Sequence, residues 1–181
     1  PMAKLPPHIK VARAALRKAI ALKTWKAEGV TLRATMFRLV DVGEDRETSG
    51  RAGYWGGWVK VGGESTDAFI QQVVVHELAH TCLKRSPTTC DHHGPRFQGL
   101  MRAASCEFFG LTDAELLPLW RASKEWYKGH NFKHAYQLDW VIAELVHKRT
   151  GGSARDRERE ERARARRRAA IERHKLKRGA A

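Results

Sequence analysis

Two histidines four residues apart, with a glutamate directly after the first, constrain this chain more than any other feature. They form the segment His76-Glu77-Leu78-Ala79-His80. On a helix, side chains at i and i+4 share one face, with Cβ atoms about 5–6 Å apart, so the two imidazoles can bind one metal ion. Glu77 is rotated by about 100° from His76. This position suits a general base that takes a proton from a metal-bound water.

The residues around this motif predict that its helix is buried. Apolar side chains occur on every side of it: Phe69, Ile70, Val73, Val74, Val75, Leu78, Ala79 and Leu83. A helix that is apolar all round is normally buried, and a buried ionisable side chain needs a partner. The motif alone also fits two ordinary polar histidines, but burial favours a metal site. Ser65 or Thr66 is expected to cap the start of the helix, and Pro87 to follow its end.

A catalytic zinc ion has three protein ligands and keeps one position open for water. The residue six positions after His80 is Ser86, so the extended spacing H-E-x-x-H-x-x-G-x-x-H is absent. The later segment Cys90-Asp91-His92-His93-Gly94-Pro95 offers two further histidines. Its proline predicts the start of a second helix. The loop between the two helices is long enough to return a histidine to the first.

These motifs resemble the SprT-like metallopeptidases, which include the Spartan DNA–protein crosslink proteases. The first motif is His76–His80, and the second is His93-Gly94-Pro95-Arg96-Phe97 followed by Met101. The resemblance implies a Zn²⁺ ion bound by His76, His80 and His93, with Glu77 as the catalytic base.

The identity of the third ligand has one alternative, which is His92. Gly94 directly follows His93, and this register favours His93. Asp91 and His92 would then be candidates for orienting a ligand imidazole through its other nitrogen. Cys90 is a further, less favoured ligand.

The fold that the resemblance implies is an α+β, zincin-like domain with a small sheet, the H-E-x-x-H helix and further packing helices. Residues 49–61 are similar to the Gly-Arg strand that precedes the metal helix in the family. We expect a strand at 54–61, and in zincin folds this is the edge strand beside which an extended substrate pairs.

Other elements are predicted from periodicity and from turn residues. Before the motif, we expect a helix over 8–27 and a strand over 30–42, followed by a charged loop over 43–50. After it, Thr112 marks the start of a helix that includes 116–127, and another covers 138–148. The intervening segment holds candidates for stabilising a developing oxyanion, among which no spacing rule chooses: Tyr127, His130, Asn131, His134 and Tyr136.

The cysteines and the hydropathy indicate the cellular compartment and whether a zinc ribbon is expected. Cys82, Cys90 and Cys106 form no C-x-x-C pair, so the zinc ribbon that many SprT-like proteins carry is not expected. Three scattered cysteines suit a reducing compartment, and Cys82 and Cys106 are expected to be buried. Because no long apolar run is present, we predict a cytoplasmic protein that does not associate with membranes.

The charge distribution predicts a domain over 1–148 and an Arg-rich tail over 149–181. The tail has 13 Lys and Arg residues and five Asp and Glu residues, a net charge of +8 out of +14 for the chain. Gly151 and Gly152 mark the hinge. Because the tail lacks an apolar stripe, we expect a solvated helix or a disordered end that does not pack on the domain. Clustered arginines favour non-specific nucleic-acid binding.

The sequence therefore predicts a zinc-dependent metallopeptidase. Glu77 would accept a proton from the zinc-activated water and pass it to the leaving amine. Its substrate is a protein or peptide, brought close by nucleic acid on the tail. The alternative is a non-proteolytic protein that binds nucleic acid or a partner and uses a zincin fold with a structural metal. An intact Glu77 favours the enzyme, because a structural site needs no base there.

Overall fold

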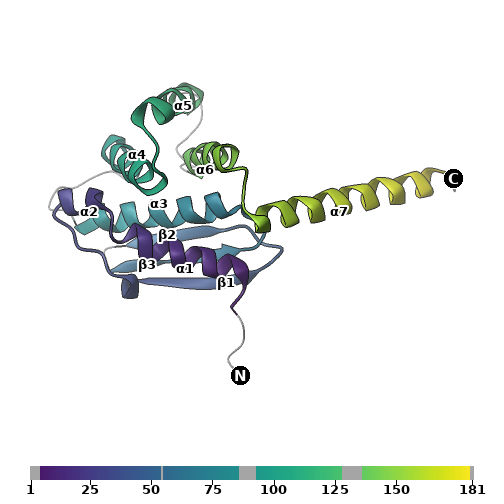
Figure 1. Ribbon diagram of the computed structural model, residues 1–181, viewed down its shortest axis with the longest axis horizontal. Coiled ribbons are helices and arrows are strands. Elements are labelled where there is room, and N and C mark those ends of the chain that lie inside the picture. The colour runs from purple at the N-terminus through teal and green to yellow at the C-terminus, as the bar shows by residue number, and fades with distance from the viewer. Residues whose placement is uncertain (1–4, 54, 86–92, 128–135, 180–181) are drawn as a thin grey trace.

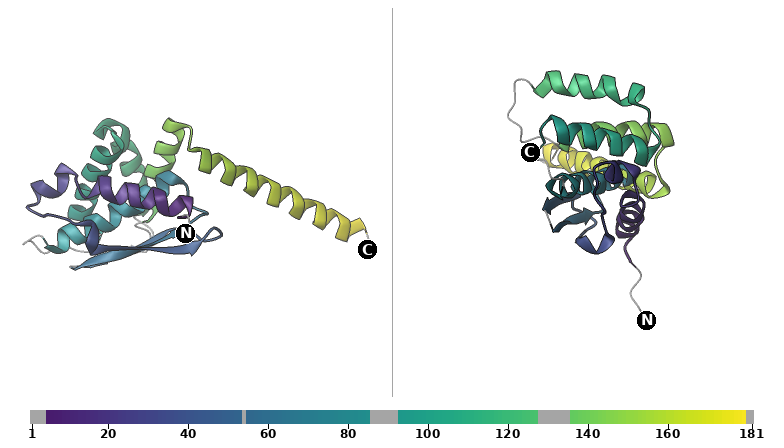
Figure 2. Two further views of the ribbon diagram at one scale, coloured as in Figure 1. Left: turned by 60° about the horizontal axis from the view of Figure 1, so that its bottom comes forward. Right: turned by 90° about the vertical axis from the view of Figure 1, so that its left-hand side faces the viewer.

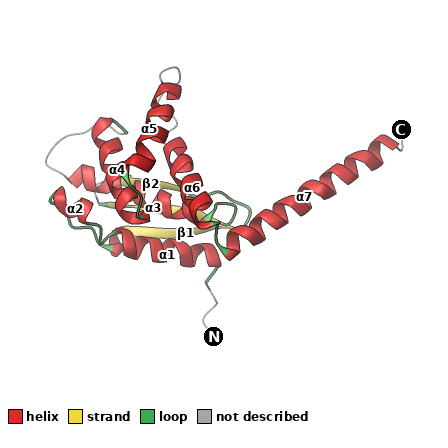
Figure 3. Cartoon of the chain, turned by 45° about the horizontal axis from the view of Figure 1, so that its top comes forward, coloured by secondary structure: helices red, strands yellow, loops and turns green. Residues whose placement is uncertain are grey.

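The computed structural model describes residues 5–53, 55–85, 93–127 and 136–179, without the side chains of 53, 85, 122–127, 136–137 and 170–179. These residues form an α+β fold with one three-stranded sheet (Figure 1, Figure 3). The elements follow in the order α1 (Pro7–Ala19), α2 (Lys23–Ala27), the 3-10 helix η1 (Ala34–Met36), β1 (Phe37–Gly43), β2 (Ser49–Gly53), β3 (Gly56–Gly62), α3 (Asp67–Arg85), α4 (Pro95–Phe109), α5 (Asp113–Tyr127), α6 (Tyr136–Thr150) and α7 (Ala154–Gly179).

The strand order in the sheet is β1-β3-β2, with β1 parallel and β2 antiparallel to β3. The strand predicted at 54–61 corresponds to β3. The prediction that this strand is the edge that pairs with substrate is wrong, because β3 is the central strand of the sheet. The hairpin partner β2 occupies one edge instead. The segment 43–50 was expected to be a loop throughout, yet β2 begins at Ser49. Thr48 explains this, because its buried backbone N–H donates to Ser65 Oγ (2.8 Å) and anchors the start of the strand.

Helix α3 lies at the centre of the fold. The sheet and α1 are on one side of it, and α4 and α6 are on the other (Figure 1). Its burial on all sides confirms the prediction from its apolar surroundings: Val73, Val74, Val75, Leu78 and Ala79 are at most 1% exposed. Thr66 caps the helix, because its Oγ1 accepts a hydrogen bond from the Phe69 N–H (3.1 Å).

The predicted helix over 8–27 is two helices, α1 and α2, with a break at residues 20–22. Tertiary packing produces this break, since no proline or glycine is present there. The turn buries Trp25, whose indole N–H donates to the Ala19 carbonyl (2.6 Å). Glu107 of α4 caps α2, accepting hydrogen bonds from the Lys23 N–H (2.7 Å) and from the N–H and hydroxyl of Thr24.

The strand predicted over 30–42 begins only at Phe37. Residues 30–33 are irregular and η1 follows, closed by a hydrogen bond from the Met36 N–H to the Arg33 carbonyl (3.0 Å). Downstream, the predicted starts of α4 at Pro95 and of α5 after Thr112 are confirmed. Thr112 and Glu115 form a reciprocal cap, in which Glu115 Oε2 accepts from the Thr112 N–H (2.7 Å).

The Arg-rich tail forms α7, which projects from the rest of the chain (Figure 1). The expectation that the tail does not pack is wrong for its first turns. Asp156 is 1% exposed, and its Oδ1 accepts a hydrogen bond from the Asp67 N–H at the start of α3 (2.9 Å). Arg155 donates to the Asp67 carboxylate and to the carbonyls of Gly63 and Ser65. Polar contacts therefore anchor the first turns of α7.

The prediction that Cys82 and Cys106 are buried is confirmed for one of them. Cys82 is fully buried as expected, whereas Cys106 is only half-buried. Within the described part of the chain, no helix has the length and apolarity needed to cross a membrane.

Candidate metal centre

His76 and His80 lie one turn apart on α3 and direct their imidazoles to the same point. Their Nε2 atoms are 3.0 Å apart. His76 is 1% exposed and His80 is half-buried. The i, i+4 spacing thus produces the shared helix face predicted from the sequence.

His93 joins this pair from the segment before α4. Its Nε2 lies 2.8 Å from that of His80 and 3.3 Å from that of His76. Tetrahedral zinc with bonds of about 2.0–2.1 Å to nitrogen separates its ligand atoms by roughly 3.3 Å, so three converging nitrogens at these distances fit such an ion. The alternative ligand His92 lies outside the described residues, as do Cys90 and Asp91.

His93 adopts an unusual backbone conformation. Its φ is +62°, and it is the non-glycine residue with positive φ in the described part of the chain. Histidine enters this region more readily than most residues, but the conformation still costs about 1 kcal/mol or more. The turn points the imidazole back at α3 just before Gly94 and Pro95 begin α4. Local strain therefore accompanies the convergence of the three histidines.

Phe97, on the first turn of α4, packs against all three imidazoles. Its ring is stacked on His80 at 4.2 Å between centroids, and it meets the rings of His76 and His93 at 5.0 and 4.9 Å. Phe97 is 1% exposed. One buried aromatic ring thus restricts the orientation of each candidate ligand.

A buried polar chain supports His76 from behind. Asp139 Oδ2 on α6 lies 2.8 Å from His76 Nδ1, and both side chains are at most 1% exposed. Gln72 donates to the other oxygen of Asp139 (2.9 Å) and accepts from the Ser105 hydroxyl (3.0 Å). Because Asp139 occupies Nδ1, the His76 Nε2 is left to act as a metal ligand. Burial lowers the pKa of His76, but the Asp139 carboxylate and Glu77 outweigh it and raise the pKa overall.

Glu77 lies beside the histidine cluster and is 2% exposed. Burial raises the pKa of its carboxyl to about 7, a value suited to a general base at neutral pH. Gly50 of β2 makes room for it, since a Cβ at position 50 would overlap the Glu77 side chain. Among the described residues, the buried Oε2 atom of Glu77 has no hydrogen-bond partner. A buried carboxylate oxygen in this state leaves an acceptor available for a bound group or a water molecule.

The charges of the site also fit a cation. Three imidazoles can be neutral ligands, while Glu77 and Asp139 are carboxylates buried within the same cluster. A divalent ion balances two such carboxylates, which are costly to bury without a counter-charge. The residues present therefore suit a divalent metal such as zinc.

Several site residues were not predicted from the sequence. Gly50, Gln72, Ser105 and Asp139 belong to this group. Asp139 carries a recognisable signal, because it lies on the apolar stripe of α6 with Leu138, Ile142 and Ala143, all buried. The candidate oxyanion residues His130, Asn131 and His134 lie outside the described residues, and the side chains of Tyr127 and Tyr136 are not described.

Comparison with protein families agrees with the resemblance seen in the sequence. Residues 60–115 match the SprT-like family. The matched segment spans less than half of the chain and runs from β3 to the start of α5, so it contains the three histidines, Glu77 and Phe97. Gly50 and Asp139 lie outside it. Comparisons with curated proteins and with solved structures found no match.

Proposed function

We propose that this protein is a zinc-dependent metallopeptidase of the SprT-like type. The observation that supports this most strongly is the convergence of three imidazole Nε2 atoms within 3.3 Å of one another, with a buried glutamate beside them. A zinc ion held by His76, His80 and His93 would polarise the substrate carbonyl and lower the pKa of a water molecule towards about 7.

The proposed role of Glu77 is to move protons. In its ionised form, the buried carboxylate accepts a proton from the attacking water and then delivers it to the amide nitrogen that leaves. Burial raises the pKa of this carboxyl above its ordinary value, which makes it a better proton acceptor than a surface glutamate. Gly50 leaves the carboxylate in place, and Phe97 and Asp139 hold the imidazoles, so the reacting groups are oriented before substrate binds.

The substrate segment is proposed to bind along β2. Within the described residues, β2 pairs only with β3, so its other side is an edge that can accept an extended peptide. Gly50 places this strand against Glu77. Lys84 of α3 also donates to the Ala52 carbonyl (3.2 Å), which ties the strand to the metal helix. A bound peptide would therefore lie beside the base.

The proposed partner of the tail is nucleic acid. From Arg162 to Ala181 the tail has nine Lys and Arg residues and one acidic residue. Arg162 and Arg166 pair with acidic residues of the domain, and helix α7 projects from the rest of the chain (Figure 1). Such a segment neutralises phosphates without reading sequence. Proteins bound to the same nucleic acid would then be brought near β2.

The decisive experiment compares Glu77→Gln with the wild-type chain for bound zinc and for cleavage of casein. We expect the variant to retain zinc and to lose about 10²- to 10⁴-fold in cleavage rate, the usual contribution of a positioned acid–base group. His93→Ala serves as the control that should lose zinc as well. Equal cleavage by wild type and Glu77→Gln would rule out the proposed mechanism. A wild-type protein that binds zinc but cleaves neither casein nor a DNA-bound protein would favour the non-proteolytic alternative.

A further inference from the structure

One face of the sheet is left uncovered by the helices of the described residues. Both α1 and α3 pack on the same face, where Val59 and Val61 are buried (Figure 2, left). Alternate residues of each strand point to the opposite face. These include Arg38, Trp58, Lys60 and Arg51, and we call them the outer face.

The outer face carries a cation–aromatic–cation row. Arg38 of β1 and Arg51 of β2 both align with Trp58 of β3, so the tryptophan lies between two arginines. With strands about 4.8 Å apart, the two arginines stand roughly 10 Å from each other. Lys60, two residues further along β3, places its Nζ 5.0 Å from the centroid of the Trp58 ring.

Charge on this face is of one sign. The strand positions that share it carry Arg38, Arg51 and Lys60 but no carboxylate. Arg38 and Arg51 are exposed, and neither forms an ion pair with another described residue. The one acidic residue of β1, Asp41, points the other way and contacts His8 of α1 (2.9 Å). The outer face therefore attracts anions.

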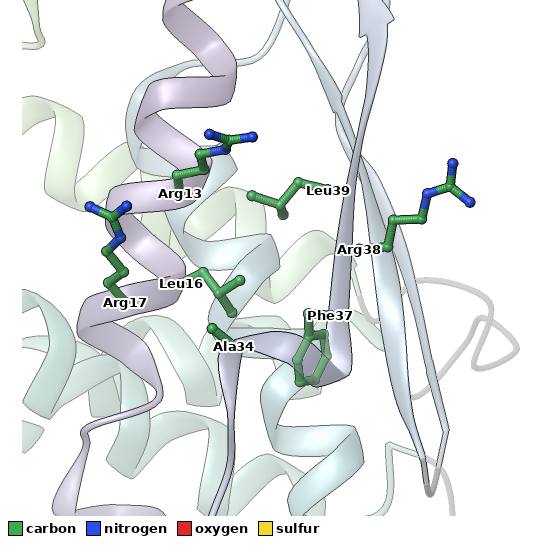
Figure 4. A pocket seen from close by; sticks show the side chains of 7 residues that line it. All are labelled: Arg13, Leu16, Arg17, Ala34, Phe37, Arg38 and Leu39. Atoms are coloured by element: carbon green, nitrogen blue, oxygen red, sulfur yellow. The ribbon is translucent and has the colours of Figure 1, made fainter. Parts of the chain in front are cut away.

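A hollow continues this cationic surface round the free edge of β1. It has a volume of about 340 Å³, and its apolar floor includes Leu16, Phe37 and Leu39. Figure 4 shows Arg13 and Arg17 on the α1 side and Arg38 on the far side of the strand. Helix α1 contains no acidic residue. An apolar floor between guanidinium groups suits a ligand with both a flat apolar part and negative charges.

We propose that the outer face binds single-stranded nucleic acid. A base stacks on Trp58, phosphates contact Arg38 and Arg51, and the strand continues over β1 towards Arg13 and Arg17. Unpaired bases expose the flat faces that stack on aromatic side chains, whereas a duplex offers only its phosphates to such a surface. An acidic protein would match the charges but would leave the tryptophan without a stacking partner.

This site deepens the proposed function, although binding itself does not depend on it. Arg51 on the outer face is the direct neighbour of Gly50, which lies against Glu77 from the inner side. Nucleic acid on the outer face would thus pass one strand residue away from the proposed cleavage edge. Binding uses no metal-centre residue, so the two proposals can fail separately.

The test measures binding of a fluorescent oligo-dT by anisotropy, using the full chain at several salt concentrations. Trp58→Val should weaken binding roughly 5- to 100-fold and leave the salt dependence unchanged, because stacking carries no charge. The double variant Arg38→Gln/Arg51→Gln should weaken binding and reduce the slope of log K against log salt by about 1.4. Lys26→Gln/Arg121→Gln, which removes two exposed charges elsewhere, is the matched control.

The remaining outcomes separate the alternatives. Arg13→Gln/Arg17→Gln changes exposed side chains of α1 and keeps the test valid if a strand variant fails to fold. If all three variants bind oligo-dT like the control pair, the proposal is wrong. It is also wrong if only replacement of Arg164, Arg167 and Arg168 in α7 abolishes binding. Equal competition by poly-glutamate would assign the face to an acidic protein and overturn it too.

Discussion

Gly50 of the edge strand lies so close to Glu77 of the metal helix that a Cβ atom at position 50 would overlap the Glu77 side chain. The two residues come from different layers of the fold, and neither is near the other in sequence. The absence of a Cβ at position 50 is thus what lets β2 approach the candidate base. A substitution at position 50 can therefore displace the Glu77 carboxylate while leaving the three candidate metal ligands unchanged.

Gly50→Ala should reduce peptide cleavage by at least about 10-fold while zinc affinity stays near the wild-type value. The added methyl displaces the Glu77 carboxylate, and small misplacements of a catalytic group have large effects on rate. Cleavage assays paired with a zinc-chelator competition measure the two quantities. Gly99→Ala on α4 is the control, since a Cβ there meets nothing within 4 Å. A Gly50→Ala variant as active as this control would contradict the role assigned to the contact.

Asp139→Asn should weaken zinc binding by about 10- to 100-fold, the usual effect of losing a carboxylate that orients a ligand histidine. The substitution keeps the shape of the side chain but removes the charge facing His76 Nδ1. Isothermal titration with zinc provides the measurement. Glu144→Gln, at an exposed position of the same helix, should bind zinc normally. Unchanged affinity in Asp139→Asn would show that Asp139 serves packing alone.

Removal of the metal should lower the melting temperature. A ligand that binds only the folded state stabilises it by about 2.7 kcal/mol at a free concentration 100 times its Kd. Differential scanning calorimetry with and without a chelator should show this shift, and acidification should abolish it because imidazole ligands must be neutral. His93→Ala should be insensitive to the chelator. A shift that persists in that variant would indicate a different metal site.

Glu107 should make stability depend on pH. Burial tends to raise its pKa, but the hydrogen bonds from Lys23 and Thr24 outweigh this and lower it. A lowered pKa means that the stabilisation is fully present above pH about 4.5 and is lost as the pH falls through the folded-state pKa. At pH 7, Glu107→Gln should cost about 1 kcal/mol of unfolding free energy, as for other helix caps. Urea titrations at pH 7 and pH 3 should show the difference shrinking at the lower pH, whereas an equal cost at both would refute it.

Local signals in the sequence predicted the local parts of the fold. The spacing of His76 and His80 gave their shared face, and Pro95 and Thr112 marked the starts of α4 and α5 correctly. These features depend on neighbouring residues alone. The third histidine was predicted only through resemblance, because its return to α3 depends on a turn with positive φ at His93.

Features that depend on contacts between distant segments were missed. Asp139 meets His76 across 63 residues of sequence, and Glu107 caps a helix more than 80 residues earlier. The helix break before Trp25 has no glycine or proline, so only the burial of that indole explains it. The position of a strand within a sheet is likewise not encoded locally, which is why β3 was mistaken for an edge.

Through the hydrogen bond from the Asp67 N–H to Asp156, the projecting helix α7 stabilises the start of the metal helix α3. A cut at the glycine pair Gly151–Gly152 would remove more than a charged appendage. It would leave the first turn of α3 with an unmet backbone donor and the Asp67 carboxylate without Arg155, nine residues upstream of His76. Proteolytic processing at that turn would thus loosen the peptidase centre from its far end. The tail can be trimmed without this effect only beyond its anchored turns.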